Sequence, residues 1–346
     1  MGRFPLLEEP DLLRMPVIRL KGFSAPESIR KLAGDASTRV YFRTYYEGGR
    51  TAVVMVQPHP HQNQLAKFLE VHEFLENLGT PVPRIYALDR INGVIVLEDL
   101  GDDLLEDTVV CSSEERVREL YAEAVDLLVN LRLRTVGLGR KCNELNPPFD
   151  ENKFTDEMNY FMTHFVEGLC KLMPSSVGRA TLEEFFRKIC QQLGQEPRSF
   201  CHRDYHARNL IVHDDRLVMI DFQDARMGPV QYDPASLLRD SYVTLPEDLV
   251  DELLTRYQEG IEEIGHRAGS RFRYIFNVMS LQRNIKALGT FGYQISVRRS
   301  RRYQSSIART GAYIASTIRL HEEFSAYAPV VEDYISGPAL AMTPVT

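Results

Sequence analysis

Three side chains that can act as bases or metal ligands are grouped in one short stretch of the chain. Asp204 and Asn209 belong to the octapeptide His202-Arg203-Asp204-Tyr205-His206-Ala207-Arg208-Asn209, and Asp221 follows twelve residues later. One carboxylate can orient a hydroxyl nucleophile and accept its proton, while an amide oxygen and a second carboxylate are hard ligands that suit Mg²⁺. The stretch therefore predicts phosphoryl transfer, with Asp204 as the catalytic base and Asn209 and Asp221 as magnesium ligands.

The surrounding sequence predicts that these three residues lie on loops between short strands. An apolar run precedes the octapeptide, and two more runs frame a turn signal after it: Leu210–Val212, Asp214-Asp215 and Leu217–Ile220. Asp204 and Asn209 would then share one loop, and Asp221 would come just after the next strand. The octapeptide alone would also fit a polar surface loop, and the strand–turn–strand–Asp sequence after it favours the phosphoryl-transfer interpretation.

The first third of the chain alternates like a sheet. Runs of β-branched and aromatic residues, separated by turn signals, predict five short strands at 28–32, 39–46, 51–56, 85–88 and 94–97. Apolar residues at helical spacing predict one helix over 65–78. The sequence thus predicts an α+β fold in which 1–24 is an extension and 25–98 forms a small five-stranded amino-terminal lobe with one helix.

Residues 99–346 read as a larger, mainly helical lobe. Ser112-x-x-Glu115 resembles a capping box, and further helices are expected from Lys153, Leu182, Glu247, Phe272 and Tyr303. After Asp221 the chain reaches Asp233 and Pro234, which suit the cap and the first turn of another helix. This lobe would carry the catalytic loop and bind the acceptor.

Composition excludes several classes of protein. The 346 residues are 44% hydrophobic, but no apolar run approaches the length of a membrane span. Five scattered cysteines without a C-x-x-C spacing read as reduced thiols of a cytoplasmic protein with no zinc site. A net charge of −7 argues against general nucleic-acid binding. We expect no nucleic acid, membrane or obligate protein partner.

Four segments together resemble one family more closely than any single motif does. They are Gly34–Arg43, Leu97–Asp102, Tyr232–Asp240 and Leu281–Gly289. The chain resembles the bacterial anomeric N-acetylmuramate/N-acetylglucosamine kinases, within the aminoglycoside phosphotransferase-like superfamily, over roughly residues 25–330. The resemblance implies a two-lobed, protein-kinase-like fold. It also implies ATP-dependent, magnesium-assisted phosphorylation of the C1 hydroxyl of an amino sugar in cell-wall recycling.

The resemblance also implies roles for individual residues. Asp204 would be the base and His202 would brace its loop. ATP would be held by backbone groups of the phosphate-covering turn and of the connector to the second lobe: Gly34, Asp35, Ala36, Ser37, Glu98 and Leu100. The departure is Met55, which stands where such kinases carry a lysine for the ATP phosphates. Arg39 and Arg43 on the neighbouring strand are candidates for the missing cation, because a guanidinium binds phosphate oxygens well.

The acceptor site is expected on the second lobe. Polar side chains that could bind a sugar follow the metal-binding turn and recur on two later helices: Gln223, Asp224, Arg239, Asp240, Gln282, Asn284 and, beside the last two, Arg283 and Lys286. For any single residue, a place on a helix surface or, for the charged ones, in a salt bridge within the lobe is the favoured interpretation, and only as a set do they predict an acceptor site. Two other functions stay open: a kinase of another small-molecule hydroxyl, such as an aminoglycoside or amino alcohol, and a pseudokinase that only binds ligands.

Overall fold

The structure is a computed structural model, and it describes residues 8–32, 39–57, 62–263, 269 and 271–342. The chain divides into two compact units. The first unit is Met1–Leu104 with Leu210–Gln223, and the second is Leu105–Asn209 with Asp224–Thr346. The chain therefore passes from one unit to the other directly after Leu104, Asn209 and Gln223.

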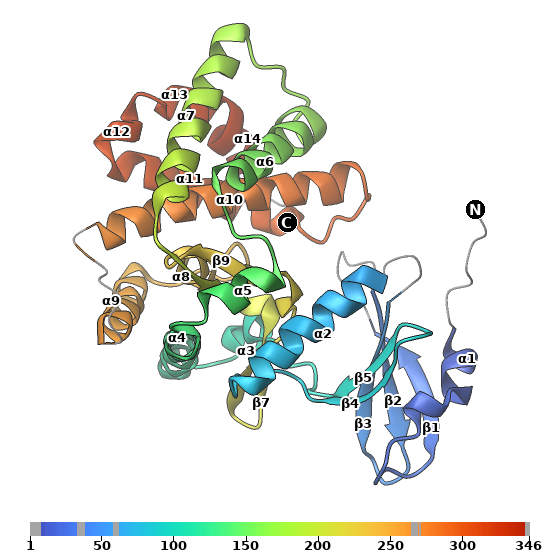
Figure 1. The fold of residues 1–346 in the computed structure, drawn as a ribbon. Coiled ribbons are helices and arrows are strands. Elements are labelled where there is room, and N and C mark those ends of the chain that lie inside the picture. The colour runs from blue at the N-terminus through green and yellow to red at the C-terminus, as the bar shows by residue number, and fades with distance from the viewer. Residues whose placement is uncertain (1–7, 33–38, 58–61, 264–268, 270, 343–346) are drawn as a thin grey trace. The chain divides into compact units, whose positions relative to one another are not determined.

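The first unit is built on one antiparallel sheet with the strand order β1-β2-β3-β5-β4 (Figure 1). Its strands are β1 (Pro26–Lys31), β2 (Val40–Tyr46), β3 (Thr51–Val56), β4 (Ile85–Asp89) and β5 (Val94–Glu98). All five predicted strands are confirmed to within two residues at each end. Met55 pairs with Tyr41 on one side and Ile95 on the other, so these three side chains share a face of the sheet.

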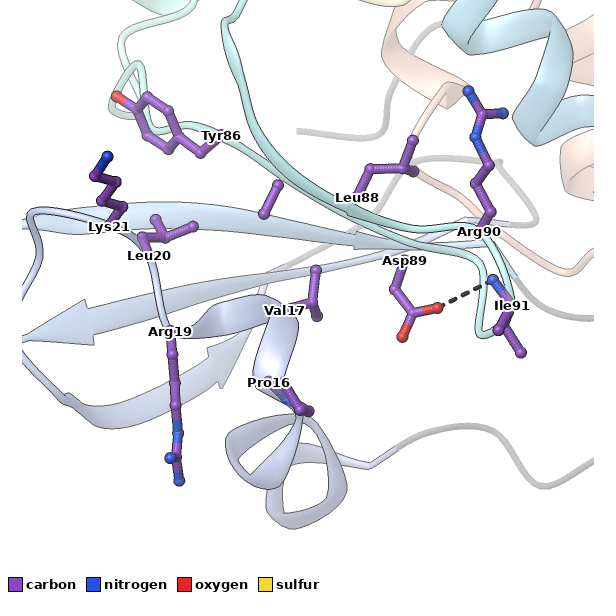
Figure 2. Close-up of a pocket in the computed structure, with 11 residues that line it drawn as sticks. Pro16, Val17, Arg19, Leu20, Lys21, Tyr86, Leu88, Asp89, Arg90 and Ile91 are labelled. Atoms are coloured by element: carbon purple, nitrogen blue, oxygen red, sulfur yellow. Dashed lines mark hydrogen bonds between the residues drawn. The ribbon is translucent and has the colours of Figure 1, made fainter.

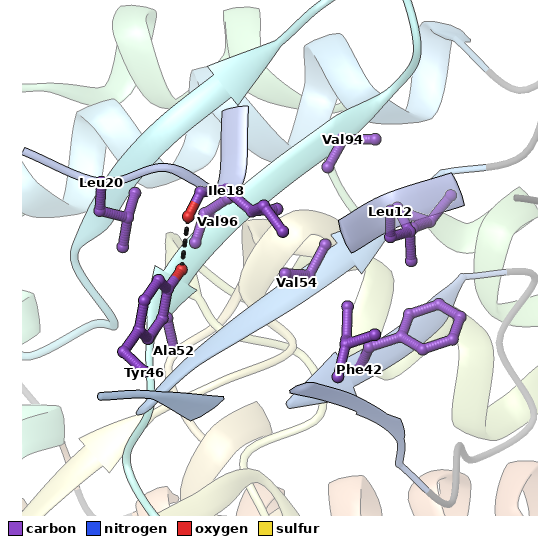
Figure 3. Packing of buried hydrophobic residues seen from close by; sticks show 11 residues of the cluster. Leu12, Ile18, Leu20, Phe42, Tyr46, Ala52, Val54, Val94 and Val96 are labelled. Atoms are coloured by element: carbon purple, nitrogen blue, oxygen red, sulfur yellow. Dashed lines mark hydrogen bonds between the residues drawn. The ribbon is translucent and has the colours of Figure 1, made fainter. Parts of the chain in front are cut away.

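The opposite face of the sheet is covered by the chain's own amino-terminal segment. Helix α1 (Glu9–Arg14) and the 3₁₀ turn η1 (Pro16–Ile18) contribute buried apolar side chains to a cluster with β2, β3 and β5. Figure 3 shows Leu12 and Ile18 beside Val54, and the Tyr46 hydroxyl donating to the Ile18 carbonyl at 2.8 Å. The described part of the predicted extension, from Glu8 onward, therefore contributes to this unit's core.

A helix and a hairpin complete the first unit. Helix α2 (Gln62–Asn77) confirms the predicted helix, and β7 (Leu210–His213) pairs with β8 (Arg216–Met219). The hairpin is bonded to this unit through the Val212 amide, which donates to the Asp103 carbonyl at 2.8 Å, and the Met219 amide, which donates to the Pro81 carbonyl at 3.0 Å. Asp221 follows β8, so its position is fixed by this unit.

The second unit is mainly helical, as predicted (Figure 1). Its longer helices are α4 (Glu114–Thr135), α6 (Glu151–Phe161), α7 (Ser176–Gln195), α9 (Glu247–Glu263), α10 (Phe272–Ser296) and α11 (Gln304–Leu320). Its shorter ones are α3 (Leu105–Val110), α5 (Gly139–Leu145), α8 (Tyr232–Leu238), α12 (Glu322–Ser325), α13 (Ala328–Val331) and α14 (Gly337–Leu340). Within the described residues, no helix is both long and apolar enough to cross a membrane.

Two predicted helix caps were wrong. Helix α4 is capped by Ser113, whose hydroxyl accepts the Arg116 amide at 3.2 Å, and not by Ser112. Helix α8 begins two residues earlier than expected, at Tyr232, with Gln231 at its cap position. Asp233 therefore lies inside the first turn, where it is fully buried and bonds to other parts of the unit. Its carboxylate has a tertiary role that a local capping rule does not reveal.

Helix α10 packs closely on α6 and on the π-helical turn η2 (Met162–Leu169) that extends it. A Cβ at Gly289 would lie 2.8 Å from the Phe161 Cα, and one at Gly292 would lie 2.8 Å from the Phe165 Cα. The absence of a side chain at these two positions lets the backbones approach. The face of α10 that carries Gly289 and Gly292 is thereby held against α6 and η2.

Candidate active site

The predicted catalytic loop, residues 202–209, is held by a buried carboxylate. Residues 202–209 connect β6 (Arg198–Cys201) to β7, and Arg203 in this loop has a positive φ of 84°. The Asp233 carboxylate accepts the His202 amide at 2.8 Å and the Arg203 amide at 3.0 Å. Asp233 also pairs with Arg132 at 3.3 Å, and neither side chain is exposed to solvent. The unusual backbone at Arg203 is thus stabilised by two hydrogen bonds at the position before Asp204.

Asp204 accepts bonds from two cations of helix α10. Its Oδ1 lies 2.9 Å from the Lys286 ammonium and 3.2 Å from the Arg283 guanidinium. Burial alone would raise the pKa of this carboxyl, but Lys286, Arg203 and Arg283 overcome that effect and hold the pKa well below its usual range. Asp204 is therefore ionised at physiological pH, which is the state that its predicted role as a base requires.

Asn209 and His206 complete the loop around Asp204. The Asn209 amide nitrogen donates to the Asp204 carbonyl at 2.8 Å, and the side-chain oxygen is not used in that bond. His206 is a neighbour of Asp204 that the sequence did not single out, and burial lowers its pKa to about 3. It therefore stays neutral across the physiological range. A neutral imidazole adds no charge to the cations already present.

The His202 side chain packs inside the second unit, next to its own loop. It is buried, and its ring meets the Tyr205 ring edge-on with 5.6 Å between centroids. The Tyr205 hydroxyl in turn donates to the Ala124 carbonyl of α4 at 2.8 Å. Together with the bond from its amide to Asp233, this packing agrees with the bracing role that the sequence predicted for His202.

In the first unit, Asp221 is close to a buried arginine. Asp221 has a φ of 61°, and its Oδ1 lies 3.8 Å from Arg39 Nη1 and accepts the Gln223 amide nitrogen at 2.8 Å. The next residue, Phe222, is buried with its ring 5.1 Å from the ring of Phe68 on α2. These contacts hold the turn against α2 and keep the Asp221 carboxylate, about half exposed, beside a cation.

Arg39 and Arg43, the two candidates for the missing lysine, have different surroundings. Arg39 is only 8% exposed, donates to the Gln57 side chain at 3.2 Å and lies over the Phe68 ring at 5.5 Å. Arg43 is bound by two carboxylates of the connector, Asp99 and Asp102, at 2.7 to 3.0 Å. Met55 is fully buried. The structure therefore brings Arg39, and not Arg43, next to the predicted metal ligand Asp221.

The remaining predicted nucleotide contacts are only partly described. Gly34, Asp35, Ala36 and Ser37 lie outside the described residues. Glu98 ends β5, and its amide donates to the Arg84 carbonyl at 2.8 Å. The Leu100 carbonyl accepts a hydrogen bond from the His213 ring at 3.1 Å. A contact of the Glu98 and Leu100 backbone with adenine stays a prediction.

The predicted acceptor residues fall into two groups. Several are committed to partners within one unit: Asp224 to Arg203, Arg239 to Glu247, Gln282 to Glu157, and Asp240 to the Ala207 and Tyr242 amides. Asn284 is buried, and burial raises the pKa of Asp240 to about 7. In contrast, Arg283 and Lys286, which alternate with Gln282 and Asn284 along α10, reach Asp204. Helical periodicity thus separates the residues facing Asp204 from their buried neighbours.

Two further features of the described residues bear on ligands. They contain no group of three or more His, Cys, Asp or Glu side chains arranged to hold a metal ion. A hollow of about 620 Å³ lies between the amino-terminal segment and the β4–β5 hairpin, as Figure 2 shows. Residues 16, 17, 19–21 and 86–91 line it, and none of the predicted site residues is among them.

The ion pair beneath the catalytic loop supports a stability prediction. Asp233→Asn should lower the free energy of unfolding by about 3–5 kcal/mol, because the buried Arg132 guanidinium would lose its carboxylate. Urea denaturation followed by circular dichroism measures the loss. Arg132→Met combined with Asp233→Asn should cost less than the sum of the two single changes. Strictly additive losses would show that the pair is not energetically coupled.

Comparison with known proteins places this chain in a family. Residues 28–270 match the model of the phosphotransferase enzyme family APH. The N-acetylmuramate/N-acetylglucosamine kinase of Pseudomonas aeruginosa is 29% identical over 307 residues, which cover 87% of this chain and 86% of that protein. The protein of the same name from Neisseria meningitidis serogroup B is 29% identical over 305 residues, covering 87% and 89%.

Solved structures confirm the predicted kinase-like fold. The ADP-bound aminoglycoside phosphotransferase APH(2'')-Ib is similar with a TM-score of 0.56 at 18% identity, over 84% of this chain and 92% of that one. An ethanolamine kinase of Plasmodium vivax is similar with a TM-score of 0.60 at 14% identity, over 86% and 84%. At such low identity these likenesses establish the fold alone. The match to the family model over most of the chain goes further: the chain belongs to the phosphotransferase enzyme family.

Proposed function

We propose that the protein is an ATP-dependent kinase that phosphorylates the C1 hydroxyl of N-acetylmuramate, N-acetylglucosamine or both. The proposal rests mainly on the ionisation and the placement of the Asp204 side chain. This side chain is an ionised carboxylate on a loop whose backbone is fixed by Asp233, with Asn209 bonded to the same loop. Two relatives at 29% identity over most of the chain are named as kinases of these two sugars, which supports the choice of acceptor.

The proposed reaction depends on positioning more than on basicity. The sugar hydroxyl would donate its hydrogen bond to Asp204 and attack the γ-phosphorus of ATP in line, passing its proton to Asp204 late in the step. A carboxylate whose pKa is held so low is a weak base, so its main contribution is to align the nucleophile. Arg283, which is itself held by the Tyr232 and Ser236 hydroxyls, fixes the carboxylate for that purpose.

Magnesium is the proposed cofactor, with Asn209 and Asp221 as its ligands. The residues fit this role, because each presents a hard oxygen of the kind that Mg²⁺ prefers. The Asn209 amide nitrogen is engaged by the Asp204 carbonyl, which leaves the side-chain oxygen for a metal, and Asp221 is about half exposed. When bound, the metal would neutralise phosphate charge. Its other ligands would be phosphate oxygens and water.

The proposed setting is the cytoplasm. All five cysteines are free thiols, and four of them are at least partly shielded from solvent. Free thiols persist where the redox environment is reducing, and that is also where ATP is available.

An acceptor panel tests the proposal. ADP release should be measured with ATP and magnesium in the presence of amino sugars, aminoglycosides and amino alcohols. Turnover with N-acetylmuramate or N-acetylglucosamine, giving a phosphorus NMR signal that disappears under mild acid, supports phosphorylation at C1. An acid-stable sugar phosphate would move the reaction to another hydroxyl. Turnover with only a cationic acceptor would reject the proposal, and the positive charge beside Asp204 argues against that outcome.

A further inference from the structure

Two cations of α10 converge on one oxygen of the proposed catalytic base. Arg283 and Lys286 are three residues apart, so they lie one above the other on the same face of the helix. Both donate to Asp204 Oδ1, at 3.2 and 2.9 Å. One carboxylate oxygen thus carries two positive partners, and the acceptor hydroxyl would have to compete with them for Asp204.

The two cations are held very differently. The Arg283 guanidinium also donates to the Tyr232 hydroxyl at 2.9 Å and the Ser236 hydroxyl at 2.5 Å, and it lies 4.8 Å from the centre of the Tyr232 ring. Among the described residues, the Lys286 ammonium donates only to Asp204, although an ammonium group has three hydrogens to donate. The Arg283 side chain is therefore fixed. The Lys286 ammonium can turn toward another hydrogen-bond acceptor and lose only its bond to Asp204.

The local charges leave a positive surplus. Glu157 accepts bonds from Gln282 at 2.7 Å and Arg203 at 3.4 Å, and Asp224 accepts from Arg203 at 2.9 Å. These two carboxylates are thus engaged by Arg203 and its neighbours, and Asp204 alone is left to balance Arg283 and Lys286. Arg283 also has a buried Nε without a hydrogen-bond partner. An anion bound here would compensate a charge that the protein itself does not fully neutralise.

Farther along the same face of α10, three aromatic rings lie together. Tyr293 is two helical turns beyond Lys286, and its ring lies 5.0 Å from the ring of His164 on η2 and 6.0 Å from that of Tyr160 on α6. The Tyr160 and His164 rings are 4.2 Å apart, and Tyr160 is 36% exposed. Aromatic rings beside a few placed polar groups are typical of small-molecule sites, and the apolar face of a sugar packs well on such rings. This arrangement favours an acceptor along α10.

We infer that Lys286, beside the fixed cation Arg283, is the subsite for a carboxylate carried by the acceptor sugar. This inference rests on the proposed function. N-acetylmuramate carries a lactyl carboxylate that N-acetylglucosamine lacks, so the two sugars would share Asp204 but differ at Lys286. When the anionic sugar binds, Lys286 turns from Asp204 to the lactyl group, and the oxygen it leaves accepts the C1 hydroxyl.

The test compares three acceptors in one variant. Lys286→Met should lower kcat/KM for N-acetylmuramate about tenfold to a hundredfold more than for N-acetylglucosamine, because a hydrogen bond between two charged groups is lost. The methyl ester of N-acetylmuramate has nearly the same shape without the charge, so it should follow N-acetylglucosamine. Lys286→Arg keeps a cation and should restore most of the preference for the acid.

The quantity to compare is the ratio of kcat/KM for N-acetylmuramate to kcat/KM for N-acetylglucosamine. This ratio separates an effect on carboxylate binding from an effect that the variant has on every acceptor. Removing Lys286 also removes a positive charge from Asp204, so the acid limb of the kcat/KM profile should move to higher pH equally with every acceptor. Arg273→Met is the matched control: it removes one cation from the same helix, where Arg273 is bound to Asp251 at an exposed position. It should leave the ratio unchanged, and thermal denaturation should show that all variants fold.

Three outcomes overturn the inference. Equal losses on the acid, its methyl ester and N-acetylglucosamine would assign Lys286 to a step that all acceptors share, such as contact with the transferred phosphoryl group. If the wild type phosphorylates N-acetylglucosamine but not N-acetylmuramate, Lys286 does not bind a sugar carboxylate, while the proposed kinase activity stands. If the wild type phosphorylates neither sugar, the proposed function fails, and the inference fails with it.

Discussion

Asp204→Asn should lower kcat by about 10²–10⁴-fold while ATP still binds, since general-base alignment contributes on that scale. The substitution keeps the size of the side chain but removes the charge that Lys286 and Arg283 contact. The amide that the substitution introduces would also be able to turn its nitrogen toward the sugar, and a nitrogen that donates a hydrogen bond does not accept one from the sugar hydroxyl. ADP release measures kcat, and titration calorimetry with ATP measures nucleotide binding.

A second carboxylate provides the control for this substitution. Asp126 is also bound to an arginine, Arg256, at 2.6 Å, but it lies on the exposed surface of α4. Asp126→Asn should leave kcat near the wild-type value, because it changes the net charge equally without touching the catalytic loop. Activity of Asp204→Asn close to that of Asp126→Asn would exclude Asp204 as the base. Thermal denaturation of both variants separates a loss of chemistry from a loss of folded protein.

The sequence predicted the first unit well because its signals are local. Alternating β-branched and aromatic residues, interrupted by Gly48-Gly49 and Asn92-Gly93, mark strand ends through backbone conformations that the neighbouring residues determine. Gly48, Gly49 and Gly93 all have positive φ angles in the structure. The hairpin that follows the loop of Asp204 and Asn209 was also predicted, because the loop and both strands are coded in one stretch.

The partners of those residues could not be predicted in the same way. Asp233 reaches the catalytic loop across about thirty residues of sequence, and Lys286 reaches Asp204 across 82. No local rule connects such pairs, because the contact depends on how α8 and α10 pack. The sequence drew attention to 282–286 only as a polar patch, and the structure sorts it by helical phase: Arg283 and Lys286 contact Asp204, whereas Gln282 binds Glu157.

The replacement for the missing strand lysine is the second site where a large effect is expected. Arg39→Ala should raise the KM for ATP and lower kcat/KM by roughly 10²-fold, the scale seen when one preorganised donor to a developing charge is removed. Arg39 is the stronger candidate because it is buried beside Asp221, whereas Arg43 is held by Asp99 and Asp102. Arg43→Ala should therefore reduce kcat/KM by a smaller factor. Steady-state kinetics with varied ATP compares the two.

A purely structural role for Arg39 would give a different pattern. Arg39 contacts Gln57 and the Phe68 ring, so its removal should also lower the thermal midpoint, whatever it does for ATP. Calorimetry with ATP and with adenosine separates the two roles, because only ATP carries phosphates. If Arg39 binds phosphate, Arg39→Ala weakens ATP and spares adenosine, and Arg39→Lys recovers part of the loss, since an ammonium keeps the charge without the planar fork. Equal weakening of both ligands would mean that Arg39 only supports the fold, and the phosphates would need another cation.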